Sequence, residues 1–323
     1  GMVAGQAVVW YTGQFYALFY LQSILRVDQF TANVLIAWSL TVGTFGFLFF
    51  GWLSDKIGRK PIILGGCLVA ALTFFPLFEL MTKTANPALY EAQQKTKIVV
   101  TADPAQCSFQ FNPTGTSKFT SSCDIAKAAL ARSSATYSTE AAPAGTTTKV
   151  KIGETEIQAF DVAKLTGDET KSVPAAFTKS MNEALQKAGY PGATNSSIVK
   201  IPIEPKDGLK NFAKMFDVFS TQKMTIIAIL TILVLYVTAV YGPIAAALVE
   251  FFPTRIRYSG LSLPYHIGNG WFGGLLPATA FAMVAATGDI YFGLWYPVGI
   301  ALMTVVIGIF FVPETYKRDI FKQ

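Results

Sequence analysis

Polar side chains inside long apolar stretches are the residues of this sequence best placed to do chemistry. The single histidine, His266, lies in such a stretch, three residues before Asn269 and five before Trp271. An imidazole gains and loses a proton near neutral pH, and residues three apart share a helix face. His266 is therefore a candidate proton carrier, and the alternative is a histidine that only bonds a neighbouring helix.

A second group lies near the start of the chain, where Gln14 is flanked by Tyr11 and Tyr16. A hydrogen-bonding, aromatic-lined helix face suits a small carboxylate or zwitterion. Gln14 can equally form a hydrogen bond between two helices. The aromatic residues can equally belong to the belt that gathers at a membrane interface. Both interpretations stay open. The candidate substrate-binding residues are Gln14, Tyr11, Tyr16, Asn269 and Trp271.

No pattern in the sequence indicates catalysis. There is one histidine and there are three cysteines, and neither a metal-ligand spacing, a glycine-rich phosphate loop nor a nucleophile–base arrangement is present. We expect no enzyme, no metal and no cofactor. The 26 basic residues lie at the ends of apolar stretches and across the middle of the chain, not in one stripe, so we expect no nucleic-acid partner.

The elements that must position these residues are membrane helices. Only 14% of the 323 residues are charged, whereas soluble domains carry about a quarter. Asp, Glu, Lys and Arg are absent from six windows, residues 1–25, 29–54, 61–78, 224–249, 258–288 and 290–313. About 18 or more helical residues cross the roughly 30 Å core of a bilayer. The sequence predicts six transmembrane helices, the fifth kinked by Pro264 and Pro277 and beginning near Ser262.

The segment between the third and fourth windows, residues 83–223, has the composition of a small soluble α+β domain. Its patterns predict helices over 87–97, 124–132 and 173–188, strands over 98–101, 108–111, 148–152, 156–162 and 198–203, and a surface loop over 133–148. Asp207 is expected to cap a final helix. The domains are therefore 1–82, the insert 83–223, and 224–323.

The charges of the short connections predict the orientation. If the spans alternate, one set of connections holds eight basic residues and the other holds Arg26 alone; the eight are Lys56, Arg59, Lys60, Arg255, Arg257, Lys317, Arg318 and Lys322. Basic short loops face the cytoplasm. The insert then lies outside, in an oxidising compartment where Cys107 and Cys123 are expected to form a disulfide, with two free thiols as the alternative.

Two loops combine charges and glycines in a specific pattern. In residues 51–60, Gly51 is expected to permit close helix approach, Gly58 to allow a tight turn, and Asp55 to accept hydrogen bonds from Arg59. A simple basic membrane anchor is the alternative, but it requires neither glycine. Residues 250–260 begin with Glu250 and contain Arg255 and Arg257.

These stretches resemble known transporter loops. Residues 51–60, GWLSDKIGRK, resemble the cytoplasmic loop of the major facilitator superfamily, and residues 250–260, EFFPTRIRYSG, resemble a loop of its metabolite:proton symporter branch. Val312-Pro313-Glu314-Thr315 is similar to the signature that follows the last helix of sugar-porter-like members. The resemblance implies a conformational gating loop formed by Gly51, Asp55, Gly58, Arg59, Glu250, Arg255 and Arg257.

The resemblance also implies what the whole protein does. A full transporter of this superfamily has twelve helices in two halves with substrate between them, and the six here resemble helices seven to twelve. We therefore expect a missing N-terminal half, a multi-pass protein of the bacterial inner membrane, and proton-driven symport of an organic acid, amino acid or betaine. The alternative is a membrane sensor whose external domain binds a ligand.

Overall fold

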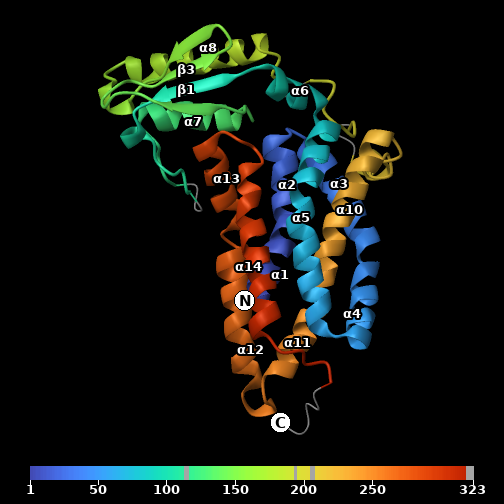
Figure 1. The fold of residues 1–323 in the computed structure, drawn as a ribbon. Coiled ribbons are helices and arrows are strands. Elements are labelled where there is room, and N and C mark those ends of the chain that lie inside the picture. Colours follow the sequence, from blue (N-terminus) through green and yellow to red (C-terminus); the bar gives the residue numbers. More distant parts are fainter. Residues whose placement is uncertain (113–115, 193–194, 204–207, 318–323) are drawn as a thin grey trace.

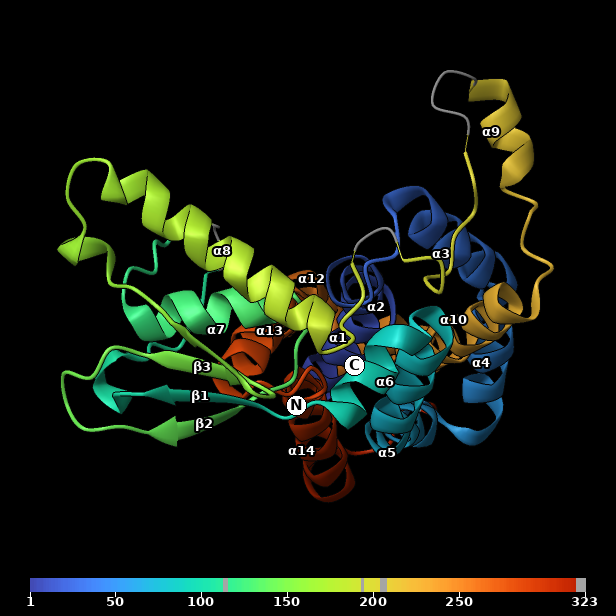
Figure 2. The ribbon, with the colours of Figure 1, turned by 90° about the horizontal axis from the view of Figure 1, so that it is seen from above.

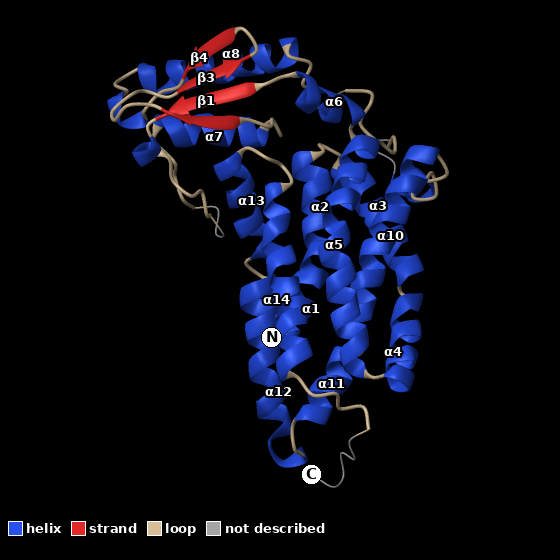
Figure 3. Ribbon diagram, in the orientation of Figure 1, coloured by secondary structure: helices blue, strands red, loops and turns tan. Residues whose placement is uncertain are grey.

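The computed structural model describes residues 1–112, 116–192, 195–203 and 208–317. In this part of the chain a bundle of long helices carries a small α+β unit on one end (Figures 1 and 3). We call that end of the bundle the insert end and the opposite end the loop end. Asp207, Arg318 and Lys322, for which the sequence predicts roles, lie outside the described residues.

The bundle begins with one continuous helical run in which α-helix and π-helical turns alternate: α1 (Met2–Tyr11), η1 (Thr12–Tyr16), α2 (Ala17–Phe19) and η2 (Tyr20–Ile24). Its other long helices are α3 (Gln29–Gly43), α4 (Phe45–Ile57), α5 (Arg59–Ala85), α10 (Thr221–Tyr241), α11 (Ile244–Phe251), α12 (Arg257–His266), α13 (Leu276–Thr287) and α14 (Trp295–Phe311). Shorter turns are η5 (Thr254–Ile256), η6 (Ile267–Gly273) and η7 (Phe292–Leu294).

Five helical stretches in the described part of the chain are long and apolar enough to cross a membrane: Gln29–Ile57, Arg59–Ala85, Thr221–Phe251, Thr254–Thr287 and Phe292–Phe311. The first helical run is not among them, and it carries Gln6, Gln14 and Gln22. Its α1 packs against α5, α10 and α14 inside the bundle (Figure 1). Polar side chains in such a position face other helices and avoid contact with lipid. A multi-pass helical protein is thus supported, and the count of six spans stays a prediction.

The fifth predicted span differs from its prediction. It begins at Arg257 and not near Ser262, and it is divided into α12, the π-helical η6 and α13. Pro277 lies in the first turn of α13, where its missing N–H leaves no helical bond unmade. A second α-helix therefore begins at Leu276, beside this proline, and π-helical turns replace the expected kink within the one stretch Thr254–Thr287.

The insert consists of α6 (Pro87–Lys95), β1 (Ile98–Ala102), η3 (Pro104–Gln106), α7 (Ser122–Arg132), β2 (Ser138–Ala141), β3 (Lys149–Ile152), β4 (Thr155–Gln158), η4 (Val162–Lys164), α8 (Glu169–Lys187) and α9 (Gly208–Lys214). The strands form one sheet in the order β2-β1-β3-β4, with β1 parallel to β2 and the other pairs antiparallel. Val100 is opposite Val150, and Val150 is opposite Ile157. All three are buried, so they form the apolar face of the sheet that α7 and α8 cover.

Three local predictions in the insert were wrong. Residues 108–111 and 198–203 are not strands, because side chains hold their backbone instead of a neighbouring strand. Ser108 N–H donates to the Asp124 carboxylate (2.8 Å), and Ile201 N–H donates to the Thr31 hydroxyl (2.8 Å). The predicted loop 133–148 contains β2, which extends the sheet beside β1.

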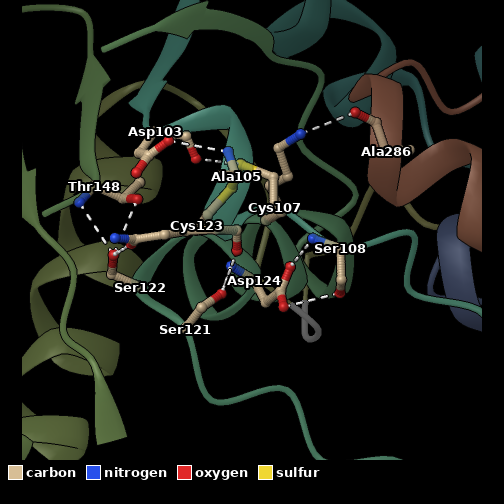
Figure 4. Close-up of a disulfide and its surroundings, with 12 residues drawn as sticks. Asp103, Ala105, Cys107, Ser108, Ser121, Ser122, Cys123, Asp124, Thr148 and Ala286 are labelled. Atoms are coloured by element: carbon tan, nitrogen blue, oxygen red, sulfur yellow. Dashed lines mark hydrogen bonds between the residues drawn. A yellow bond between two sulfur atoms is a disulfide. The ribbon is translucent and has the colours of Figure 1, made fainter. Parts of the chain in front are cut away.

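A disulfide joins Cys107 to Cys123 at the start of α7 (Figure 4). Ser121 caps the same helix by accepting from the backbone N–H of Asp124 (3.1 Å). The segment before α7 is attached to its first turn by this disulfide and by hydrogen bonds from Ser108 N–H to Asp124 and from Ser121 Oγ to the carbonyl of Gln106.

The insert is docked on the bundle through carbonyl groups at helix ends. Lys127 Nζ donates to the carbonyl of Ala286 (3.0 Å), and Tyr137 Oη donates to that of Ala285, both near the end of α13. Ser134 Oγ donates to the carbonyl of Ile24 (2.7 Å) at the end of the first helical run. Seen from above, the sheet extends sideways beyond α13 (Figure 2). These bonds satisfy carbonyls that a helix terminus leaves without a partner.

Candidate functional site

Charged side chains from separate segments meet at the loop end of the bundle. Arg59, the first residue of α5, donates from Nη1 to Ser54 Oγ (2.8 Å) and to the Asp55 carboxylate. Its Nε and Nη2 donate to Glu250 Oε1, each at 3.3 Å. The Arg59 and Glu250 side chains are only 13% and 12% exposed, against 61% for Asp55. The pair with Glu250 is therefore the less solvent-screened of the two.

Glu314 binds the same corner from the end of α14. Its carboxylate accepts from the backbone N–H groups of Arg59 (3.1 Å) and Lys60 (3.0 Å), the first two residues of α5. A negative charge is favourable at a helix N-terminus, where N–H groups lack partners. Gly58 has φ +108°, and a Cβ at this position would collide with the Glu314 carboxylate. Glycine is required here for both reasons.

Two further bonds complete this network. Thr315 Oγ1 donates to Glu250 Oε2 (2.7 Å), and Lys60 Nζ donates to the carbonyl of Val312 (2.8 Å) just after α14. We call Ser54, Asp55, Arg59, Lys60, Glu250, Glu314 and Thr315 the ionic cluster. It connects the α4–α5 turn, the end of α11 and the segment after α14, so these three parts of the loop end are held together.

The remaining residues of the predicted gating loop lie outside this network. Arg255 is exposed, and Arg257 donates from Nε to the carbonyl of Phe252 (3.1 Å). Gly51 was expected to permit a close helix approach, but a Cβ built on it meets no atom within 4 Å. The close approach of α4 to α10 is at Gly46, where a Cβ would collide with the Thr238 side chain.

A second constellation lies on the first helical run and the helices beside it. Trp10 Nε1 donates to Gln14 Oε1 (2.9 Å), and the Trp10 ring contacts Tyr241 at 5.2 Å between centroids. Tyr241 Oη lies 2.8 Å from Tyr265 Oη. We call Gln6, Trp10, Tyr11, Gln14, Tyr241, Tyr265 and Asn269 the polar face.

Gln6 and Asn269 extend the polar face. Gln6 Nε2 lies 3.5 Å from Asn269 Oδ1, the outer limit of a hydrogen bond. Gln6 Oε1 is buried without a hydrogen-bond partner. Tyr11 packs over Gly273, where a Cβ would collide with its ring. Gln14, Tyr11 and Asn269 are therefore brought into one neighbourhood around a buried acceptor without a partner.

The other predicted site residues lie apart from the polar face. Tyr16 is fully buried against Tyr20, Phe78 and Phe281. The Trp271 side chain is 72% exposed. His266 is exposed too, and its ring contacts Tyr265 at 5.9 Å.

Gln6, Tyr241, Glu314 and Thr315 were not predicted from the sequence to lie at a site. Gln6 lies eight residues before Gln14, which is close to two helical turns, so this spacing was a usable signal. Glu314 and Thr315 lie in the noted 312–315 motif, but only the structure brings them to Arg59 and Glu250.

Comparison with known proteins supports the resemblance of the loop motifs. The family model for "Sugar (and other) transporter" matches residues 2–105. A Haemophilus influenzae protein described as a putative metabolite transport protein is 40% identical over 82 residues, which cover 24% of this chain and 17% of that protein. The chain thus spans a small part of that relative's length. No solved structure matches.

The matched range contains the motif at 51–60, whose Asp55 and Arg59 belong to the ionic cluster. The helical bundle agrees with a transporter of the type these comparisons name. Motif, helices and these partial matches make the chain similar to transporters of the major facilitator superfamily.

Proposed function

We propose that the chain is the C-terminal half of a secondary active transporter that couples uptake of a small polar metabolite to the proton gradient. The ionic cluster is the observation that carries this proposal. It ties three segments of the loop end together, so the loop end opens only when these bonds are broken or rearranged. In the superfamily the corresponding loop latches the outward-facing state, and alternating access proceeds by rocking of two halves.

The proposal assigns each end of the bundle to one side of the bacterial inner membrane. The loop end, with Lys56, Arg59 and Lys60 in one short turn, faces the cytoplasm under the positive-inside rule. The insert end faces the outside. Lipid surrounds the bundle, and a second six-helix half completes the substrate cavity.

The substrate binds at the polar face. Amide and hydroxyl groups of Gln6, Gln14 and Tyr265 lie among aromatic rings there, a combination that suits an organic acid, an amino acid or a betaine. The proton gradient supplies the energy without a cofactor. His266 is the candidate proton carrier in this half.

Uptake by the complete gene product in proteoliposomes tests this proposal. Radiolabelled succinate, proline and glycine betaine are offered with and without an inward proton gradient, and we expect at least one to accumulate only with the gradient. Gln14→Leu should lower that uptake, whereas Thr41→Val, on an exposed position of α3, should leave it unchanged. Absence of gradient-dependent uptake of any such metabolite overturns the proposal.

A further inference from the structure

A cavity of about 660 Å3 lies between the insert and the insert end of the bundle. Its walls come from both parts: Gln22 and Arg26 at the end of the first helical run, Phe281 from α13, Arg132 from α7 and Asn182 from α8. Neither the insert nor the bundle forms this cavity alone. Docking of the insert through Lys127, Ser134 and Tyr137 therefore creates it.

The charged groups on the cavity wall are all cationic. Arg26 and Arg132 line it, and no aspartate or glutamate does. Within the described part of the chain, neither guanidinium has an acidic partner, unlike Arg59. Burial lowers the pKa of Arg26, which marks a guanidinium charge that is partly desolvated and uncompensated. An anion in the cavity would supply the missing negative charge.

Other wall residues indicate the chemistry of the rest of the ligand, beyond its negative charge. Gln22 and Asn182 offer amide groups, whereas Phe119, Met181 and Phe281 are apolar. Inorganic anions gain nothing from such an apolar surface, but a carboxylate attached to a ring or a short chain uses both parts.

The cavity is separate from the polar face. Between them lies a layer of buried rings in which Tyr16 contacts Phe78 and Phe281. At 1.5 Å per residue, Gln22 lies about 12 Å further along the first helical run than Gln14. A ligand in the cavity therefore occupies a second position and does not touch Gln14.

We propose that this cavity is a binding site for a small organic anion, held by the guanidinium groups of Arg26 and Arg132 with its apolar part against Phe119 and Phe281. This inference goes beyond the proposed transport function, because binding here depends on the docked insert and not on movement of the bundle. It remains testable on the purified chain even if uptake is never observed.

Equilibrium binding to the purified full chain in detergent tests the site, with benzoate as the probe and benzamide as its neutral counterpart. We expect benzoate to bind at least tenfold more tightly than benzamide. Arg132→Gln should weaken benzoate binding at least tenfold, because it removes a charged donor from an exposed position where folding is unaffected. Arg26→Gln should do the same.

Lys187→Gln is the matched control, because Lys187 is an exposed cation of α8 that does not line the cavity. We expect it to change benzoate affinity less than twofold. The inference is overturned if benzoate does not bind, if benzamide binds equally well, or if Arg132→Gln weakens binding no more than Lys187→Gln does.

Discussion

Arg59 makes contacts of two different strengths, and this difference can be measured. Glu250 is the less exposed partner and also accepts from Thr315, whereas Asp55 is mostly in water. Exposed ion pairs contribute about 0–1 kcal/mol, while hydrogen bonds to charged groups that are withdrawn from water contribute about 1.5–3 kcal/mol.

Glu250→Gln should therefore lower the free energy of unfolding by about 1–3 kcal/mol, because a neutral amide leaves the guanidinium partly unpaired. Asp55→Asn, the matched control, should cost less than about 1 kcal/mol. Unfolding of the purified chain in detergent, followed by denaturant titration, compares the two. Equal losses would mean that burial of the Glu250 pair has no energetic effect.

Gly58 is the second residue of this corner with a measurable role. Gly58→Ala should destabilise the chain by about 1–3 kcal/mol, because φ +108° strains any residue with a Cβ and the new methyl group collides with Glu314. Gly65→Ala is the control, since a Cβ there meets no atom within 4 Å, and replacing a helical glycine by alanine is favourable. A neutral Gly58→Ala variant in the same unfolding experiment would contradict this account.

At the residue scale, the sequence predicted which residues belong to a site better than it predicted the residues that they contact. Asp55 and Arg59 are four positions apart, so a single local turn of the chain brings them together. The spacing within 51–60 therefore indicated this pair. Glu314 and Glu250 lie 255 and 191 positions away from Arg59. The resemblance placed Glu250 in the gating loop with Arg59, but only the packing of the helices pairs them and adds Glu314.

At the scale of elements, windows without charges located five long apolar helical stretches, because few soluble helices remain free of charge over 18 residues. Their ends were less well predicted. The window 61–78 became α5, Arg59–Ala85, since a charged residue at a helix end remains in the helix when its head group reaches water. The strands predicted at 108–111 and 198–203 failed because alternating residue types do not show whether a partner strand is available.

One element of the insert should respond to pH. Asp161 accepts from Ser122 N–H at the start of α7 (2.7 Å) and pairs with Lys164 Nζ (2.8 Å), joining η4 to α7. The pair with Lys164, with the Ser122 bond as a further cause, lowers the pKa of Asp161 below its ordinary value of 3.8. A lowered folded-state pKa stabilises the fold above 3.8 and loses that contribution as the pH falls below it.

Asp161→Asn should therefore lower the free energy of unfolding by about 1 kcal/mol at pH 7 and by progressively less below pH 3.8. Denaturant titrations of both proteins between pH 7 and pH 2.5 check this expectation. The comparison contains its own control, because the wild-type carboxylate also becomes neutral in acid. A difference between the two proteins that stays constant across this range would show that Asp161 acts only through its shape.

At the scale of the whole molecule, the two ends of the bundle are held by different kinds of interaction. The loop end is held by the ionic cluster, and the insert end by neutral and cationic donors on helix carbonyls. The insert therefore moves with α13 and the first helical run when the bundle changes shape. Under the proposed function, the side of the membrane that each end faces decides whether the ionic cluster closes the inner or the outer gate.

Thiol labelling can determine that orientation, because the native cysteines are silent: Cys107 and Cys123 are joined, and Cys67 is buried. Lys187→Cys, on the insert, should react with a membrane-impermeant maleimide in intact spheroplasts. Arg255→Cys, at the loop end, should react only after permeabilisation, because basic short loops stay in the cytoplasm. The reverse pattern would place the ionic cluster outside, and the cluster would then latch an inward-facing state in place of the outward-facing one.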